Sequence, residues 1–129
     1  MSRLLLADDD VQQLGIRRLL LEAAGHHVSV AEDAPAARRL LMELRPDVLV
    51  MDLRLPELAD GLSLIHCVDQ QCRGVKIIVL SGWIEELIDL PEEKLVSSAL
   101  GKPIRNDYLL EAISAAISSP DRNPPPAAS

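Results

Sequence analysis

Short apolar runs alternate along the chain with longer segments in which apolar residues recur every three or four positions. A short continuous apolar run is typical of a buried strand, whereas the three-to-four spacing is typical of an amphipathic helix. The clearest strand signal is the β-branched run that begins at Lys76. We predict five strands, the last followed at once by a turn, at residues 4–7, 26–33, 47–52, 76–82 and 99–104.

Segments with helical spacing fill the gaps between the predicted strands. The first, 11–24, is followed by Gly25, a residue that commonly ends helices because it adopts positive φ angles without strain. Asp33 and Pro35 suit the start of the second helix, as the N-cap and a first-turn residue. The apolar face of the first helix is predicted to comprise Val11, Leu14, Leu20 and Leu21.

The least regular stretch of the chain is 83–98. Ile84, Leu87 and Ile88 have helical spacing, but Pro91 lies within the stretch. Because proline cannot donate the backbone hydrogen bond of a helix interior, we expect a short or interrupted helix there. With it, the pattern predicts five helices.

Five strands that alternate with five helices predict an α/β fold. Continuous apolar strands are typical of a parallel sheet covered on both faces, and right-handed crossovers restrict the topology to a doubly wound sheet. In the run 26–33, Val28 and Val30 alternate with polar residues, which favours an edge position. We therefore predict a five-stranded, three-layer (βα)5 sandwich of strand order 2-1-3-4-5.

Composition narrows the classes of function. The chain has 129 residues, 48% of them hydrophobic, and no Phe, which favours one domain with an aliphatic core. A net charge of −7 disfavours direct nucleic-acid binding and favours a cation site or a basic partner. No apolar segment approaches the roughly 20 residues of a membrane span and no signal peptide is visible, so we expect a cytoplasmic protein without a membrane partner.

Two further features are interpreted as structural. Cys67 and Cys72 have a spacing that fits neither a zinc site nor a redox motif. Three consecutive prolines near the end of the chain cannot pack into a core. The predicted organisation is a domain at 1–118 followed by a flexible, proline-rich tail at 119–129.

Polar residues follow four of the five predicted strands. Because parallel strands point the same way, their carboxyl ends share one edge of the sheet, where ligands of such folds bind. Taken one at a time, these residues have ordinary explanations as helix N-caps, turn residues or exposed charges. They are Asp8, Asp9 and Asp10 after the first strand, Asp52 in the third, Ser81 in the fourth and Lys102 in the fifth.

Their chemistry points to a metal-assisted reaction at phosphorus. Clustered carboxylates are costly unless a cation neutralises them, and Asp8, Asp9 and Asp52 suit Mg²⁺. A carboxylate beside such an ion can act as a nucleophile and form an acyl phosphate. Ser81 and Lys102 would then stabilise charge on the phosphoryl oxygens.

Five separated motifs match, in order, those of a known protein family. They are "LLLADDD", "VLVMDLRLP", the glycine at Gly61, "IIVLSG" and "LGKPI". On these motifs, residues 3–118 resemble the CheY-like receiver domain of two-component response regulators. The resemblance implies a flavodoxin-like fold that accepts a phosphoryl group from a histidine kinase or histidine phosphotransfer protein. It implies Mg²⁺ as cofactor, with Mn²⁺ as an alternative, a downstream protein partner, and no separate substrate, so the chain is not expected to be an enzyme in the turnover sense.

The resemblance also assigns roles. It implies that Asp52 is the phospho-acceptor and that Asp9 ligates the metal directly, Asp8 through water, with Asp10 accessory. Arg54 would offer its backbone carbonyl to the metal. It further implies that two residues contact the phosphoryl group, namely Ser81 and Lys102.

Three positions depart from the family pattern. Ala99 stands where the family usually carries an aromatic residue that moves on activation, so the usual relay cannot operate. The loop from Asp52 to Gly61 is one residue longer than usual, with Ala59 as the candidate insertion. The irregular stretch 83–98 replaces part of the usual signalling face.

Two bulky residues are expected to slow self-dephosphorylation. Arg54 and Trp83 match the family positions that flank the route of the attacking water. The alternative for Trp83 is simple packing on the surface.

Two other functions stay open. A magnesium phosphohydrolase would use Asp8 and Asp10, but Gln12 stands where such enzymes need a hydroxyl. An interaction module that kept the fold and lost the chemistry is left open by Ala99. The identity of the kinase is left open, and the oligomeric state is expected to be a monomer or a weak dimer.

Overall fold

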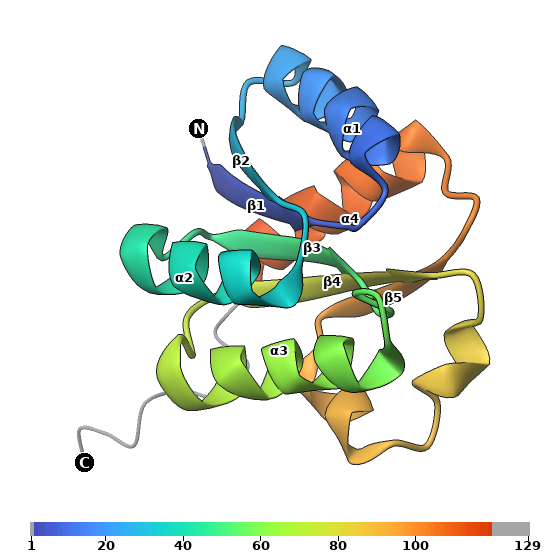
Figure 1. Cartoon of the computed structure of the whole chain (residues 1–129). Coiled ribbons are helices and arrows are strands. Elements are labelled where there is room, and N and C mark those ends of the chain that lie inside the picture. The colour runs from blue at the N-terminus through green and yellow to red at the C-terminus, as the bar shows by residue number, and fades with distance from the viewer. Residues whose placement is uncertain (1, 120–129) are drawn as a thin grey trace.

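The computed structural model describes residues 2–119, which form one parallel sheet flanked by helices (Figure 1). The strand order is β2-β1-β3-β4-β5 and every neighbouring pair is parallel. The predicted fold class and strand order are confirmed, with β2 at an edge. The strands are β1 (Arg3–Ala7), β2 (His27–Ala31), β3 (Val48–Asp52), β4 (Lys76–Ser81) and β5 (Ser98–Gly101).

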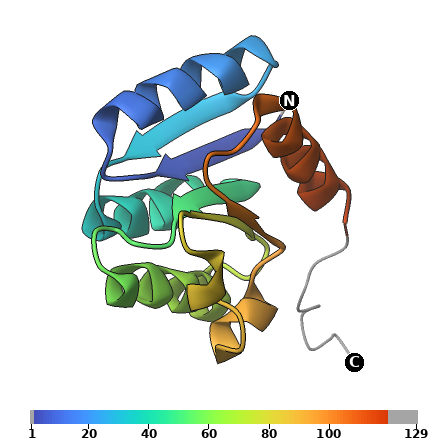
Figure 2. The same cartoon turned by 90° about the vertical axis from the view of Figure 1, so that its right-hand side faces the viewer.

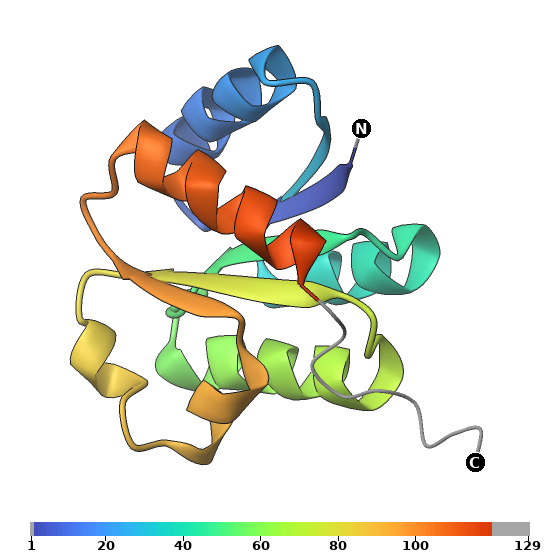
Figure 3. The same cartoon turned by 180° about the vertical axis from the view of Figure 1, so that it is seen from behind.

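Two helices cover each face of the sheet. Successive side chains of a strand point to opposite faces, so Leu4 and Leu6 of β1 contribute to one core, and Leu5 and Ala7 to the other. Figure 3 shows α4 in front of the sheet, and Figure 1 shows α2 and α3 on the opposite face. The buried side chains of α1 belong to the same core as those of α4. The helices are α1 (Val11–Ala23), α2 (Ala34–Leu44), α3 (Leu58–Gln71) and α4 (Asn106–Ser118).

Helix starts and ends follow the local sequence. The carboxylate of Asp33 accepts the N–H of Ala36 at 2.8 Å, so the predicted N-cap of α2 is confirmed. Asp10 caps α1 in the same way, accepting the N–H of Gln13 at 3.2 Å. Gly25, just after α1, has a φ of +97°. Asp10 therefore has a local structural role beside the candidate site.

The expectation of a fifth α-helix is wrong. Between β4 and β5 the chain forms two 3₁₀ helices, η1 (Ile84–Glu86) and η2 (Pro91–Leu95), which are gold and orange in Figure 2. Asp89, between them, has a φ of 72°. A positive φ and a proline two residues later stop helix propagation. Within residues 2–119 there are thus four α-helices, and the predicted interruption is real.

The predicted inner face of α1 needs a second correction. Leu14 and Leu21 are buried and Leu20 is partly buried, but Val11 is 57% exposed. The buried stripe, at three-to-four spacing, instead includes Arg17. A charged residue on this stripe requires a partner within the domain.

Gly61 lets α3 approach the loop that follows β3. A Cβ atom built at Gly61 would lie 1.7 Å from the backbone oxygen of Leu53. No side chain fits at that distance, so the glycine motif noted in the sequence has a packing reason.

The remaining expectations concern the cysteines, membrane spans and the tail. Cys67 and Cys72 are both buried free thiols, as a structural role requires. Among residues 2–119, no helix has the length and apolar character of a membrane span. The predicted tail lies outside the described residues, apart from Ser119.

Candidate metal centre

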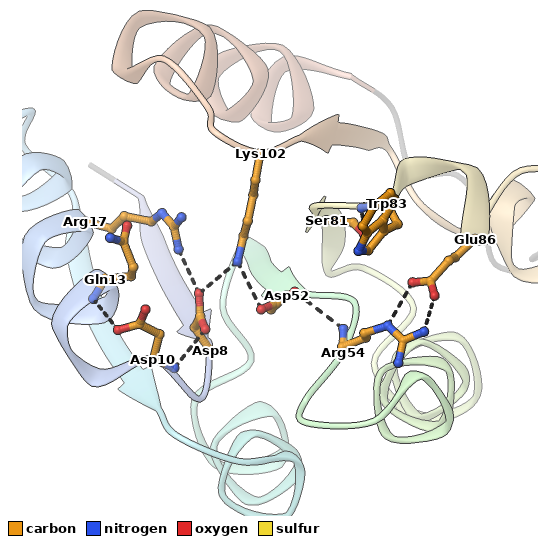
Figure 4. A network of polar contacts seen from close by, with 10 residues as sticks. All are labelled: Asp8, Asp10, Gln13, Arg17, Asp52, Arg54, Ser81, Trp83, Glu86 and Lys102. Atoms are coloured by element: carbon orange, nitrogen blue, oxygen red, sulfur yellow. Dashed lines mark hydrogen bonds and ion pairs between the residues drawn. The ribbon is translucent and has the colours of Figure 1, made fainter.

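The strand ends bring the predicted site residues to one edge of the sheet. Figure 4 shows Asp8, Asp52, Ser81 and Lys102 turned toward a common region. Carboxylate oxygens of Asp8, Asp9 and Asp52 all lie within 4.8 Å of one another. Side chains that are up to 94 residues apart along the chain therefore meet, as the fold argument predicted.

Asp8 is the most deeply buried carboxylate of this group. Its side chain is 3% exposed. One oxygen accepts the backbone N–H of Asp10 at 2.9 Å, and the other lies 2.9 Å from Nη1 of Arg17 and 3.5 Å from Nζ of Lys102. Two cations and a backbone donor thus offset the cost of burying this charge.

Arg17 is a site residue that the sequence reasoning missed. It lies three residues after Leu14 and four before Leu21, so helical spacing alone places it on the inner face of α1. The signal that could have identified Arg17 is an arginine on the apolar face of the helix that directly follows a run of aspartates.

Asp52 combines partial burial with access to solvent. Its side chain is 15% exposed, one oxygen accepts from Nζ of Lys102 at 3.0 Å, and the other faces the N–H of Arg54 at 3.4 Å. Burial raises the pKa of Asp52, and the ammonium of Lys102 opposes part of that rise. The carboxylate is therefore held beside a cation with one oxygen only weakly engaged.

Ser81 and Lys102 are joined through the backbone of neighbouring strands. The N–H of Lys102 donates to the carbonyl oxygen of Ser81 at 2.8 Å, which fixes the lysine next to the end of β4. The hydroxyl of Ser81 is buried and accepts the N–H of Trp83 at 3.0 Å. Both side chains thus lie on the same rim as Asp52 (Figure 4).

The two bulky residues singled out in the sequence lie next to Asp52 and Ser81 (Figure 4). Arg54 forms a two-pronged ion pair with Glu86 of η1, in which Nε is 3.0 Å from Oε2 and Nη2 contacts Oε1. Trp83 is 69% exposed beside Ser81 (Figure 4). Ala99, on β5, is exposed as well.

The donor set fits a hard divalent cation. Three carboxylates supply only oxygen ligands, which Mg²⁺ prefers, and Mg²⁺ usually binds one or two carboxylates while keeping several waters. Lys102 neutralises part of the same negative charge through Asp8 and Asp52. The cluster therefore has the chemistry that a magnesium ion requires.

Comparison with known sequences identifies relatives of this chain. The family model "Response regulator receiver domain" matches residues 4–114. Transcriptional regulatory protein GlrR of Escherichia coli K12 is 32% identical over 118 residues, which cover 90% of this chain and 26% of GlrR. Virulence transcriptional regulatory protein PhoP of Salmonella typhimurium is 34% identical over 90 residues, or 67% of this chain and 40% of PhoP. The chain thus spans well under half the length of these relatives.

Solved structures agree on the fold. A response regulator receiver domain protein from Clostridium thermocellum superposes with a TM-score of 0.80 at 25% identity, covering 91% of this chain and 94% of that one. The response regulator TrrA of Thermotoga maritima, solved in complex with Mg²⁺-BeF, superposes with a TM-score of 0.81 at 20% identity, covering 90% and 99%. With the family match, the strand order and the aspartate cluster all in agreement, the chain belongs to the response regulator receiver domains of two-component systems.

Proposed function

We propose that Asp52 is the residue that accepts the phosphoryl group, and that the donor is a histidine kinase or a histidine phosphotransfer protein. The observation that supports this most strongly is the placement of Asp52. Its carboxylate is partly exposed, touches Lys102 at 3.0 Å, and lies within 4.8 Å of two further carboxylates. Asp52 attacks phosphorus, the bond from phosphorus to the donor's imidazole nitrogen breaks, and the electron pair returns to the imidazole.

The proposed roles of the surrounding residues follow from their chemistry. Asp8 and Asp9, with the backbone carbonyl of Arg54, hold Mg²⁺, which when bound neutralises charge on the phosphoryl oxygens. Mn²⁺, which accepts the same oxygen ligands, is proposed as a substitute. Lys102 and the hydroxyl of Ser81 bind phosphoryl oxygens as the acyl phosphate forms.

The wider biology is proposed from the family alone. Phosphorylation changes a surface that a downstream protein partner recognises, without direct contact between this domain and nucleic acid. The chain catalyses only its own phosphorylation and dephosphorylation. A cytoplasmic location stays a prediction from the sequence.

The experiment is phosphorylation of the purified chain with acetyl phosphate and Mg²⁺, read as the mass gain of one phosphoryl group. Wild type and the control D107N, at an exposed carboxylate of α4, are expected to gain the group, and D52N is expected to remain unmodified. Equal labelling of D52N and wild type would contradict the assignment of Asp52. A wild-type chain that stays unmodified and does not respond to Mg²⁺-beryllofluoride would favour an interaction module without the chemistry, the alternative that Ala99 leaves open.

A phosphohydrolase is less well supported. Such an enzyme would need Asp10 as a catalytic group, whereas the Asp10 carboxylate accepts the N–H of Gln13 as the cap of α1. Absence of steady release of inorganic phosphate from a chromogenic phosphomonoester is the expected result.

A further inference from the structure

An ion pair between Arg54 and Glu86 lies beside Asp52 (Figure 4). Arg54, two residues after Asp52, extends its guanidinium away from the Asp52 carboxylate and toward Glu86 of η1 (Figure 4). Its backbone N–H stays 3.4 Å from an oxygen of Asp52. The same residue therefore contacts the acceptor through its backbone and a second element through its side chain.

The ion pair between Arg54 and Glu86 is exposed to solvent and therefore weak, so Arg54 can leave Glu86 for a partner that binds it more strongly. The two side chains are 47% and 20% exposed, and ion pairs in such surroundings contribute little because water competes for both charges. A phosphoryl group carries more negative charge than a carboxylate and offers three acceptor oxygens, which bind a guanidinium strongly. Once Asp52 carries that group, the guanidinium of Arg54 has two competing partners.

We propose that Glu86 is a positioning residue that holds the Arg54 guanidinium off the site in the unphosphorylated chain and releases it to the phosphoryl group on Asp52. The inference rests on the proposed function of Asp52. No bond is made or broken in this step, since only the ionic partner of Arg54 changes.

The change of partner by Arg54 would let phosphorylation of Asp52 alter how η1 is held at the protein surface. Beyond the pair with Arg54, η1 is held by the N–H of Glu86, which donates to the carbonyl oxygen of Trp83 at 3.0 Å, and by buried Leu87. Loss of the ion pair removes a polar side-chain contact between η1 and the loop after β3. This route does not need an aromatic residue at Ala99.

The test compares E86Q with R54Q in two measurements. The first is the concentration of beryllofluoride that half-saturates the Mg²⁺-loaded chain, followed by the fluorescence of Trp83, the chain's single tryptophan. The second is the lifetime of the phosphoryl group. Because E86Q removes a competitor, it is expected to tighten beryllofluoride binding by about two- to fivefold and lengthen the lifetime. R54Q is expected to weaken binding by about the same factor and shorten the lifetime.

Opposite effects of E86Q and R54Q on the phosphoryl lifetime would distinguish a change of partner by Arg54 from an ion pair that only shields the site. If Glu86 and Arg54 only shielded the site together, both variants would shorten the lifetime, and that outcome would overturn the proposal. E85Q makes the same charge change at an exposed neighbour in η1 and is expected to match wild type. In an R54Q background, E86Q is expected to have no further effect.

The remaining outcomes also decide the question. A shift of the Arg54 Nε–H resonance on adding beryllofluoride to wild type, absent in D52N, would support the exchange directly. E86Q behaving as E85Q would overturn the proposal while leaving Asp52 as the acceptor. Failure of wild type to bind beryllofluoride would instead overturn the proposed function itself, and this inference with it.

Discussion

Arg17 is buried on the inner side of α1, where its guanidinium lies 2.9 Å from the carboxylate of Asp8. The Asp8 carboxylate also lies 3.5 Å from Lys102, which in turn contacts Asp52. These contacts connect Arg17, a residue with no role predicted from the sequence, to the proposed acceptor Asp52 through Asp8 and Lys102. Removing Arg17 therefore changes both the folding energy and the charge balance of the site.

We expect R17Q to lower the free energy of unfolding by about 3 kcal/mol, because it leaves the buried Asp8 carboxylate with one cation fewer. The measurement is urea unfolding at pH 7. R18Q, one position along α1, loses only an exposed pair with Glu22 and is expected to cost under about 0.5 kcal/mol. Equal losses of unfolding free energy in R17Q and R18Q would show that burial of the Asp8–Arg17 pair does not contribute to stability.

At the scale of elements, Gly61 sets the distance between α3 and the loop after β3. We expect G61A to lower the free energy of unfolding by at least about 2 kcal/mol, because its Cβ would lie 1.7 Å from the backbone oxygen of Leu53 and the helix must move. Urea unfolding measures this loss. Gly15, in α1, has open space where its Cβ would be, so G15A is expected to be neutral or to stabilise by up to about 1 kcal/mol. A G61A chain as stable as wild type would contradict this account of the packing.

A second prediction at this scale concerns the contact between α3 and η2. Nε2 of His66 lies 2.7 Å from Oε2 of Glu92, and this hydrogen bond lowers the pKa of Glu92. A carboxyl group whose pKa is lower in the folded state stabilises the fold above its ordinary pKa, and that contribution is lost as the pH falls. E92Q is therefore expected to be less stable than wild type at pH 6, by under about 1 kcal/mol.

The difference between E92Q and wild type should shrink as the pH falls below the ordinary pKa of 4.5 toward the lowered value in the folded chain. Thermal unfolding at several pH values measures this, with E93Q, at an exposed neighbour in η2, as the control. A difference that stays constant from pH 6 to pH 3 would rule out titration of Glu92 as its cause.

For the molecule as a whole, metal binding and folding are expected to be coupled. The folded state brings Asp8, Asp9 and Asp52 together from two strand ends, whereas the unfolded chain does not. A cation that binds only the folded state stabilises it by mass action, by about 1.4 kcal/mol at ten times its Kd. We expect Mg²⁺ to raise Tm and EDTA to reverse the rise.

D9N is expected to lose most of the Mg²⁺-dependent rise in Tm, because Asp9 is exposed and its substitution changes the site more than the core. D107N serves as the control and should keep the rise. A Tm independent of Mg²⁺ in wild type would contradict the assignment of the aspartate cluster as a metal site.

The chain's apolar pattern determined the strands, their order, and the edge that carries Asp8, Asp52, Ser81 and Lys102, because strand and helix periods and right-handed crossovers are local rules. Only the tertiary structure decided which residues of different segments contact one another. Arg17 pairs with Asp8, Arg54 with Glu86, and Gly61 meets the backbone of Leu53. Such contacts follow from how elements pack, and packing joins residues whose separation along the chain carries no periodic signal.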